Sequence, residues 1–156
     1  RYILGIGTLL ATDAGLMGPL TGRDNAVLIG VLAGLSRPAA REALDDVARG
    51  AGLGEAFERP VMSYSEGMRA RVAFATAMEA GPDVVLLDEV HEALDHAYRE
   101  VVEVTVKELL ARGGIVVAAG HDHPLLERIC TRALLMQEGR IVADGPFADV
   151  QSTYLD

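Results

Sequence analysis

The chain has 156 residues, of which 50% are apolar, and its formal net charge at pH 7 is −9. This length corresponds to about one domain. The negative charge excludes an extended basic face for nucleic acid or for an anionic membrane surface, because both need clustered Lys and Arg. The only cysteine, Cys130, excludes an intramolecular disulfide.

The N-terminal segment predicts one short strand, a loop and a helix. Residues 3–10 form an apolar run broken by glycine, which is typical of a buried strand, and residues 12–22 are rich in Gly and Thr and predict a loop. Thr21 stands where an N-cap is needed for a helix that runs to Leu35.

Two further helices follow. Ser36 and Pro38 predict the start of a helix over residues 39–49. Ser65 is a suitable N-cap for a helix over residues 66–80. The segment of residues 22–80 therefore predicts a helical subdomain.

Strands and helices alternate in the second half of the chain. The runs 83–87 and 115–119 are apolar without alternation, which is typical of parallel strands covered on both faces. The other predicted elements are a helix over 97–111, a helix over 124–130, strands over 133–137 and 141–143 joined by a turn at Glu138-Gly139-Arg140, and a helix that begins at Phe147. This order predicts an α/β protein, with a helical insert at about 22–80 followed by an α/β part at about 81–156.

Two carboxylates follow the first of these apolar strands. In open α/β sheets, ligands bind at the carboxyl ends of the strands. Asp88 is a candidate ligand for Mg²⁺, a hard cation that prefers oxygen and keeps several waters. Glu89 is a candidate catalytic base, because a second carboxylate there can accept a proton from an attacking water. By itself the pair is a weak signal, and in most sequences an ordinary strand end that enters a solvated loop explains such residues.

A histidine follows the second apolar strand. An imidazole at the position of His121 can hydrogen-bond a γ-phosphate or the water that attacks it, so His121 is a candidate catalytic residue. The alternative is a histidine that caps the helix beginning near Pro124. His123 supplies a second imidazole, but no third ligand is evident in the sequence and a metal pair is not predicted.

The segment Ser65-Glu66-Gly67-Met68 opens a predicted helix. Backbone N–H groups and the helix dipole make such a start suitable for binding an anion, and the glycine leaves room for a phosphate. An ordinary serine cap explains the same residues without a ligand. Arg69 and Arg71 lie further along this helix and are expected to be solvated.

In this order, the segments resemble the nucleotide-binding subunit of ABC transporters. Residues 64–68 resemble the signature motif, with Met68 in place of the usual glutamine, and residues 84–88 resemble the Walker B strand, with Glu89 in the catalytic-base position. Ala93-Leu94-Asp95 resembles the D-loop, and His121 resembles the switch histidine.

The resemblance is closest to the branch that exports polysaccharides, O-antigen and teichoic acids. Two further segments are similar to that branch, Leu20-Thr21-Gly22-Arg23-Asp24-Asn25 and Gly139-Arg140-Ile141-Val142-Ala143-Asp144-Gly145. The resemblance implies a partial P-loop NTPase (RecA-like) layer with parallel strands plus an ABC-type helical subdomain, as the C-terminal part of one ABC ATPase domain.

The resemblance also implies ligands and partners. ATP and Mg²⁺ would be the ligands, with five residues at the ATP, namely Ser65, Glu66, Gly67, Met68 and Asp95. A second nucleotide-binding subunit would complete a head-to-tail dimer. A separate membrane-spanning permease would contact the segment around residues 24–60, at the cytoplasmic face of the cell membrane. No nucleic-acid partner is implied.

The sequence departs from the family pattern at several positions. The Walker A loop, Gly-x-x-x-x-Gly-Lys-Ser/Thr, does not occur in residues 1–156, and the only lysine, Lys107, has no glycine before it. The aromatic residue that stacks on adenine is not found either. Thr12 stands where the Q-loop glutamine is expected, and His91 and Glu92 occupy positions where the branch has small apolar residues.

We therefore expect the chain to be the C-terminal part of a longer exporter ATPase, and the 156 residues alone to be inactive in ATP hydrolysis. Two alternatives stay open. One is a degenerate, non-hydrolysing ABC-like partner or regulatory module, and the other is a non-transport ABC ATPase. The sequence does not identify the transported glycan or the permease.

Overall fold

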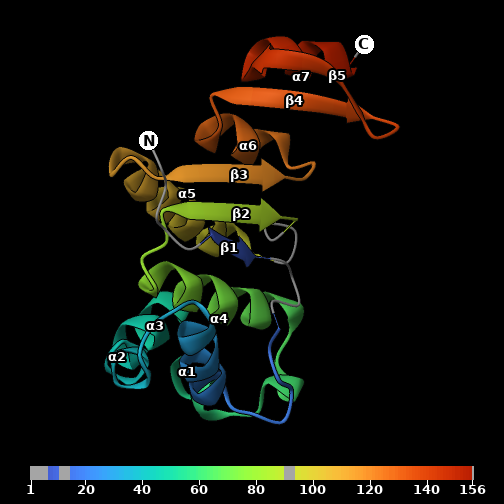
Figure 1. The fold of residues 1–156 in the computed structure, drawn as a ribbon. Helices are drawn as coiled ribbons and strands as arrows, with labels where there is room; N and C mark the ends of the chain where they lie inside the picture. Colours follow the sequence, from blue (N-terminus) through green and yellow to red (C-terminus); the bar gives the residue numbers. More distant parts are fainter. Residues whose placement is uncertain (1–6, 11–14, 90–93, 156) are drawn as a thin grey trace. The chain divides into compact units, whose positions relative to one another are not determined.

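A computed structural model describes residues 7–10, 15–89 and 94–155 of the chain (Figure 1). The chain divides into two compact units, residues 1–119 and residues 120–156. Within the described ranges, no helix is both long and apolar enough to cross a membrane.

The first unit contains a three-stranded parallel sheet. Its strands are β1 (Gly7–Leu10), β2 (Val84–Asp88) and β3 (Ile115–Ala119), in the order β1-β2-β3. In this register Leu86 of β2 lies between Leu9 of β1 and Val117 of β3. The predicted parallel strands are therefore confirmed, and their carboxyl ends meet at one edge of the sheet.

One side of this sheet is covered by helix α5 (His96–Ala111), which contacts β3 (Figure 1). Val85 and Leu87 are buried, whereas the alternate positions are open: Leu86 is 36% exposed and Val117 is 55% exposed. The prediction of strands covered on both faces is therefore not met within the described residues, because the apolar runs have a covering helix on one side only.

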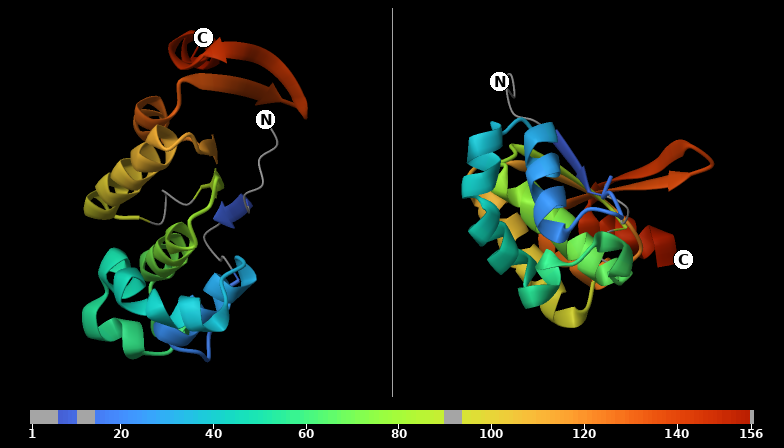
Figure 2. Two further views of the ribbon diagram at one scale, coloured as in Figure 1. Left: turned by 60° about the vertical axis from the view of Figure 1, so that its left-hand side comes forward. Right: turned by 90° about the horizontal axis from the view of Figure 1, so that it is seen from below.

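Helices α1 to α4 form the rest of the first unit. They are α1 (Gly22–Leu32), α2 (Arg37–Glu42), α3 (Leu44–Ala51) and α4 (Glu66–Glu79), and two 3₁₀ turns, η1 (Gly54–Glu58) and η2 (Val61–Ser63), lie between α3 and α4. Helices α1 and α3 both pack against α4 (Figures 1 and 2). Their apolar core contains the buried residues Ala26, Leu44, Val47, Ala51, Phe57, Val61, Tyr64, Val72 and Ala75. The predicted domain boundary near residue 80 stays a prediction.

The helix predicted over residues 39–49 is two helices. Ala43 is both the last cap of α2 and the first cap of α3. The break lets α2 pack on α1, where Ala40 approaches Gly30, while α3 packs on α4. Tertiary packing thus divides a segment that is continuous in helix propensity.

Three serine and threonine caps are confirmed. The side chains of Thr21, Ser36 and Ser65 each accept a hydrogen bond from the backbone N–H three residues later, at the starts of α1, α2 and α4. These bonds satisfy N–H groups that have no partner inside the helix. The positions of three helix starts therefore follow from local chemistry.

The segment Leu20 to Asn25 holds the start of α1 in place. Asn25 is fully buried; its side-chain oxygen accepts from Met17 N at 2.7 Å, and its amide donates to the carbonyls of Met17, Leu20 and Thr21. A Cβ at Gly22 would lie 2.9 Å from the carbonyl oxygen of Phe57, so this position needs a glycine. The similarity of this segment to the exporter branch therefore has a structural basis.

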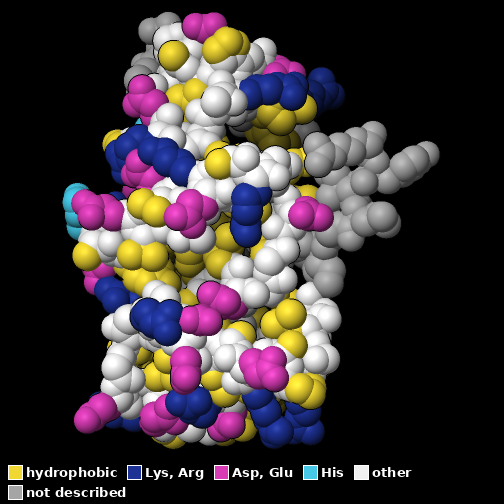
Figure 3. Space-filling view, turned by 90° about the vertical axis from the view of Figure 1, so that its left-hand side faces the viewer, with side chains coloured by type: hydrophobic (Ala, Val, Ile, Leu, Met, Phe, Trp, Pro, Cys, Tyr) yellow, Lys and Arg dark blue, Asp and Glu magenta, His cyan; other side chains and the backbone are white. Residues whose placement is uncertain are grey.

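Charges of both signs are mixed on the surface. In Figure 3, acidic and basic side chains are interspersed over the helical part of the first unit. Arg23 of α1 forms a bidentate ion pair with Glu58 of η1, and Arg49 pairs with Asp46 within α3. The negative net charge is therefore not concentrated in one patch on the face that Figure 3 shows.

The second unit is a hairpin with two helices. Helix α6 (His123–Ile129) precedes the antiparallel strands β4 (Arg132–Gln137) and β5 (Arg140–Pro146), and α7 (Phe147–Leu155) follows them. The predicted turn at Glu138 and Gly139 is confirmed, and both residues have positive φ, as a tight hairpin turn requires.

We predict that Asn25→Ala destabilises the chain by about 2 kcal/mol, because the fully buried Asn25 side chain is lost and the N–H of Met17, in a part-buried bond, loses its acceptor. The carbonyls that Asn25 contacts keep backbone donors. Thermal unfolding should show a decrease in Tm of roughly 4–8 °C for a chain of this length. The exposed Glu55→Ala variant is the control and should leave Tm nearly unchanged. An equal Tm for the two variants would contradict this role of Asn25.

Candidate functional site

The start of α4 opens into a cavity of about 500 Å³. Ser65 caps the helix, and its hydroxyl accepts from Met68 N at 3.2 Å. All five residues predicted to bind ATP line this one cavity, together with two that were not predicted: Leu53, Ser65, Glu66, Gly67, Met68, Arg71 and Asp95. Asp95 is distant from the others in sequence, so it is the fold that brings this D-loop candidate to the start of α4.

The cavity combines a polar mouth with an apolar wall. Ser65 and Glu66 are exposed, and the backbone N–H groups at the start of α4 give the site a partial positive charge. Met68, in the position where glutamine is usual, packs against the apolar core of α1 and α3. The side chain at position 68 therefore contributes to packing as well as to the cavity.

Arg71 connects α4 to the start of α5. Its guanidinium forms an ion pair with Asp95 and lies over the ring of Tyr98, 4.8 Å from the ring centroid. The hydroxyl of Tyr98 donates to the carbonyl of Arg71 at 3.2 Å. The expectation that Arg71 is solvated is therefore wrong, because its side chain is only 21% exposed. Its partner lies far along the chain, and no local pattern could have identified it.

Hydrogen bonding perturbs the acidity of this cluster. The pKa of Asp95 is lowered, first by the backbone N–H of Tyr98, which donates to its carboxylate at 2.9 Å, and then by the charge of Arg71. Burial raises the pKa of the Tyr98 phenol far above its ordinary value. Asp95 is therefore an anion at neutral pH, and Tyr98 is a neutral hydrogen-bond donor.

Asp88 and Glu89 lie at the carboxyl end of β2, and both side chains are exposed. The backbone N–H of Glu89 donates to the carbonyl of Ala119 at 3.0 Å, which fixes its position at the end of β3. Glu89 has a φ of 52°, in the left-handed region that non-glycine residues seldom adopt. Strained backbone of this kind is frequent at functional sites.

The carboxylate of Asp88 fits a magnesium ion that is held mainly by water and phosphate. Such a site needs only one or two protein carboxylates. In the described residues, no group of three or more His, Cys, Asp or Glu side chains forms a complete cage for a metal. An exposed carboxylate at a strand end suits this kind of Mg²⁺ site and does not suit a structural metal.

His121 belongs to the second unit and is exposed. The alternative interpretation, that it caps the following helix, is wrong, because the side chain of Asp122 caps α6 by accepting from Leu125 N at 3.2 Å. His121 and His123 line a small cavity of about 170 Å³ in this unit, with Leu126, Leu135 and Tyr154.

Several positions singled out in the sequence lie outside the described residues. These are Thr12 at the Q-loop position, His91, Glu92 and Ala93. Of the D-loop segment, Leu94 is buried and Asp95 is exposed.

Curated proteins that resemble the chain are ATP-binding proteins of export systems. The teichoic acids export ATP-binding protein TagH of Listeria monocytogenes is 30% identical over 97% of the chain, and the O-antigen export ATP-binding protein RfbB of Myxococcus xanthus is 29% identical over 96% of it. RfbE of Yersinia enterocolitica, also an O-antigen export ATP-binding protein, is 30% identical over 87%. No family model matches the chain.

Solved structures agree with this relationship at the level of the fold. An ATP-binding cassette solved as a dimer with ADP and phosphate superposes with a TM-score of 0.78 over 92% of the chain, at 22% identity. The chain is homologous to the ATP-binding proteins of ABC exporters. A second solved structure, the ATP-binding subunit of an ABC transporter, superposes with the same TM-score over 96% of the chain. The chain therefore has the fold of part of an ABC ATPase domain.

This homologue of the exporter ATPases spans only part of its relatives. It covers 45% of the Listeria protein, 34% of the Myxococcus protein and 57% of the Yersinia protein. It covers 63% of the dimeric cassette. The activity and partners of the whole protein are therefore matters for a proposal.

We predict that Asp95 makes stability depend on acidity. Because folding lowers the pKa of Asp95, its contribution is present above the ordinary pKa of a carboxyl and is lost as the pH falls through the lowered value. Urea unfolding at a series of pH values between about 7 and 2 should show less acid destabilisation for Asp95→Asn than for the unsubstituted chain.

The variant Arg71→Met is the matched comparison. It removes the guanidinium but keeps the Tyr98 N–H, which is the larger cause of the shift, so it should lose only part of the dependence. If the curves of stability against pH are parallel for the unsubstituted chain and Asp95→Asn, folding does not lower the pKa of Asp95.

Proposed function

We propose that the chain is part of an ATP-hydrolysing subunit of an ABC transporter that exports a polysaccharide or a lipid-linked glycan. One observation carries this proposal: Ser65, Glu66, Gly67, Met68 and Asp95 line one cavity at a helix start, in a chain whose relatives are named ATP-binding proteins of teichoic acid and O-antigen export.

The cavity at the start of α4 would bind the γ-phosphate of ATP. The backbone N–H groups at the start of α4 would place partial positive charge toward a phosphate in this position, and the hydroxyl of Ser65 would donate to it. The ATP would be held by the Walker A loop of a second subunit in a head-to-tail dimer. The dimeric state of the similar cassette supports this arrangement.

Glu89 and His121 would act on ATP held by the Walker A loop of their own subunit, which is not among residues 1–156. In the reaction, a water oxygen attacks the γ-phosphorus, the bond to the β-phosphate oxygen breaks, and ADP and phosphate form. Glu89 would accept the proton of the water, and the fixed backbone at this residue supports such a positioning role. His121 would hydrogen-bond the γ-phosphate. Mg²⁺, with Asp88 as its protein ligand, would neutralise charge on the phosphates.

The partner in the membrane would be a separate permease subunit. The segment around residues 24–60 would contact it, and the subunit would lie at the cytoplasmic face of the cell membrane. Closure of the ATP-bound dimer would then be transmitted to the permease through the helices of this segment.

We predict that Glu89→Gln, made in the full-length protein with an intact P-loop, lowers ATP turnover by about 100- to 10,000-fold, because it removes the base and keeps the shape of the side chain. ATP binding should persist and a nucleotide-bound dimer should accumulate. ATPase rate and the mass on size exclusion with ATP are measured together.

Glu138→Gln is the control for this substitution. Glu138 is the other non-glycine residue with positive φ in the described chain, at 48°, and it lies in the β4–β5 turn. Its variant should retain turnover. Unchanged turnover in Glu89→Gln would exclude Glu89 as the base, and a full-length protein that binds ATP but never hydrolyses it would favour the degenerate partner instead.

A second prediction concerns Ser65→Arg, which fills the phosphate position and removes a cap. The control Ser36→Arg removes an equivalent serine cap at the start of α2. Both variants should therefore lose about 1 kcal/mol of stability. Only Ser65→Arg should abolish ATP-driven dimer formation, measured by size exclusion of the full-length proteins.

Mixing distinguishes action in the partner's site from action in the same subunit. Full-length Ser65→Arg protein is combined with protein that has Ser65 but a disabled P-loop. If Ser65 acts on the partner's ATP, the mixed dimer contains one undamaged site and pairing with nucleotide returns. If no pairing returns on mixing, Ser65 does not act across the dimer. If the Ser65→Arg homodimer forms normally, Ser65 is only a helix cap.

A further inference from the structure

The side chains around the cavity at the start of α4 carry more negative than positive charge. Of the described residues that line it, Glu66 and Asp95 are acidic and only Arg71 is basic. Arg71 and Asp95 form an ion pair with each other, so their charges compensate. The carboxylate of Glu66 therefore decides the electrostatic character of this cavity.

Glu66 is the first residue of α4, and its side chain is exposed. Within the described part of the chain, no ion pair involves this carboxylate. It lies beside the backbone N–H groups at the helix start, whose partial positive charge stabilises an anion there. A negative side chain is thus already present where, in the proposed function, the N–H groups would attract a phosphate.

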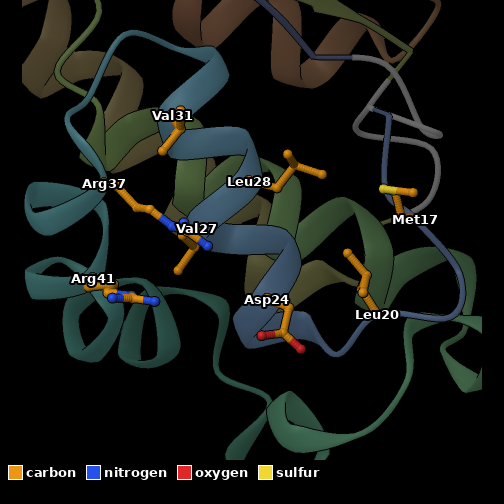
Figure 4. Close-up of a pocket in the computed structure, with 8 residues that line it drawn as sticks. All are labelled: Met17, Leu20, Asp24, Val27, Leu28, Val31, Arg37 and Arg41. Atoms are coloured by element: carbon orange, nitrogen blue, oxygen red, sulfur yellow. The ribbon is translucent and has the colours of Figure 1, made fainter.

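This negative charge is a property of the cavity and does not simply follow the net charge of the chain. A groove of about 670 Å³ over α1 is lined mainly by apolar side chains, together with Asp24, Arg37 and Arg41 (Figure 4). In Figure 4, the two arginines extend from α2 toward α1, and Asp24 stands at the start of α1. The groove therefore holds more cations than anions, although the net charge of the chain is −9.

The consequence for a phosphate follows from Coulomb repulsion. The terminal phosphate of ATP is an anion, and the carboxylate of Glu66 would have the same sign in the same cavity. Water and salt screen a charge that is as exposed as this one, so the repulsion weakens binding and does not forbid it. Phosphate and carboxylate would also compete for the same helix dipole.

We propose that the Glu66 side chain opposes closure of this cavity on a terminal phosphate, and so raises the ATP concentration at which two subunits pair. The inference rests on the proposed function and concerns the regulation of that same site. The two parts of the residue would act in opposite directions: its backbone N–H would face the phosphate, while its carboxylate would repel it.

The test compares the full-length protein with its Glu66→Gln, Glu66→Ala and Glu66→Asp variants. Dimer formation is measured by sedimentation velocity over a series of ATP concentrations, with a regenerating system that keeps ATP constant. Glu66→Gln and Glu66→Ala, which remove the charge, should lower the ATP concentration for half-maximal pairing by about three- to tenfold. Glu66→Asp, which keeps the charge, should stay close to the unsubstituted protein.

Thermal unfolding without nucleotide separates this role from a purely structural one. Glu66→Gln should slightly lower Tm, because a carboxylate in the first turn stabilises α4. A residue that only stabilises the helix would lower Tm on substitution without promoting ATP-driven pairing. The double variant Ser65→Arg/Glu66→Gln should not pair, because the arginine fills the cavity through which Glu66 acts.

Two controls isolate the local charge. Asp45→Asn removes one negative charge from the first turn of α3, outside the cavity, and should leave the ATP requirement unchanged. The difference between the unsubstituted protein and Glu66→Gln should shrink between about 0.05 M and about 0.5 M KCl, because the screening length decreases. An effect of side-chain shape would not depend on salt in this way.

The inference is overturned if Glu66→Gln raises the ATP requirement or leaves it unchanged, if Asp45→Asn lowers it equally, or if salt does not alter the difference. When the unsubstituted protein pairs with ATP and Glu66→Gln brings no gain, only this inference fails and the proposed role of the cavity stands. If neither protein pairs at ATP concentrations up to about 10 mM, above the usual range of substrate affinities, the proposed function fails as well.

Discussion

The parallel pairing of β2 with β1 and β3 is the constraint on which the rest of the first unit depends. Residues that lie far apart in the sequence are brought into register, with Val84 between Gly7 and Ile115. Strands that run in the same direction must be joined by crossovers, and α5 is the crossover between β2 and β3. All three strands consequently end at the same edge, where Asp88 and Glu89 are exposed and the Glu89 backbone is bonded to Ala119.

A second set of contacts joins this sheet to the helices. Arg71 of α4 pairs with Asp95, which is also the N-cap of α5. The same carboxylate therefore starts the crossover helix and closes one side of the cavity at Ser65. A substitution at position 95 or 71 changes the cavity and the start of α5 together, so the geometry of a bound phosphate and the stability of the fold are not independent here.

The helical part has two surfaces with different chemistry. The cavity at the start of α4 presents N–H groups and suits a phosphate, while the groove over α1 is lined mainly by apolar side chains together with Asp24, Arg37 and Arg41. Direct packing of α1 on α4 links them, and buried Asn25 holds the segment before α1 to the start of that helix. In the proposed exporter subunit, this packing would connect the nucleotide site to the segment proposed to contact the permease.

The amino-acid sequence by itself determined the features that depend on neighbours a few residues away. The caps at Thr21, Ser36 and Ser65, the apolar strands and the hairpin turn at Gly139 were all predicted, because each uses contacts within about one helical turn or the intrinsic conformation of one residue. The order of the motifs was sufficient to recognise the resemblance to exporter ATPases, and the homologous export ATP-binding proteins confirm that resemblance.

Only the tertiary structure decided which distant residues meet. It paired Arg71 with Asp95, divided the helix at Ala43 and left one face of β2 and β3 open in the described residues. It also placed Arg37 and Arg41 beside the apolar side chains of α1. A linear pattern reports that a residue is charged or apolar, but the partner that neutralises or covers it is set by the packing of whole helices and strands. For that reason the sequence identified the chemistry of the site, and the fold determined its geometry.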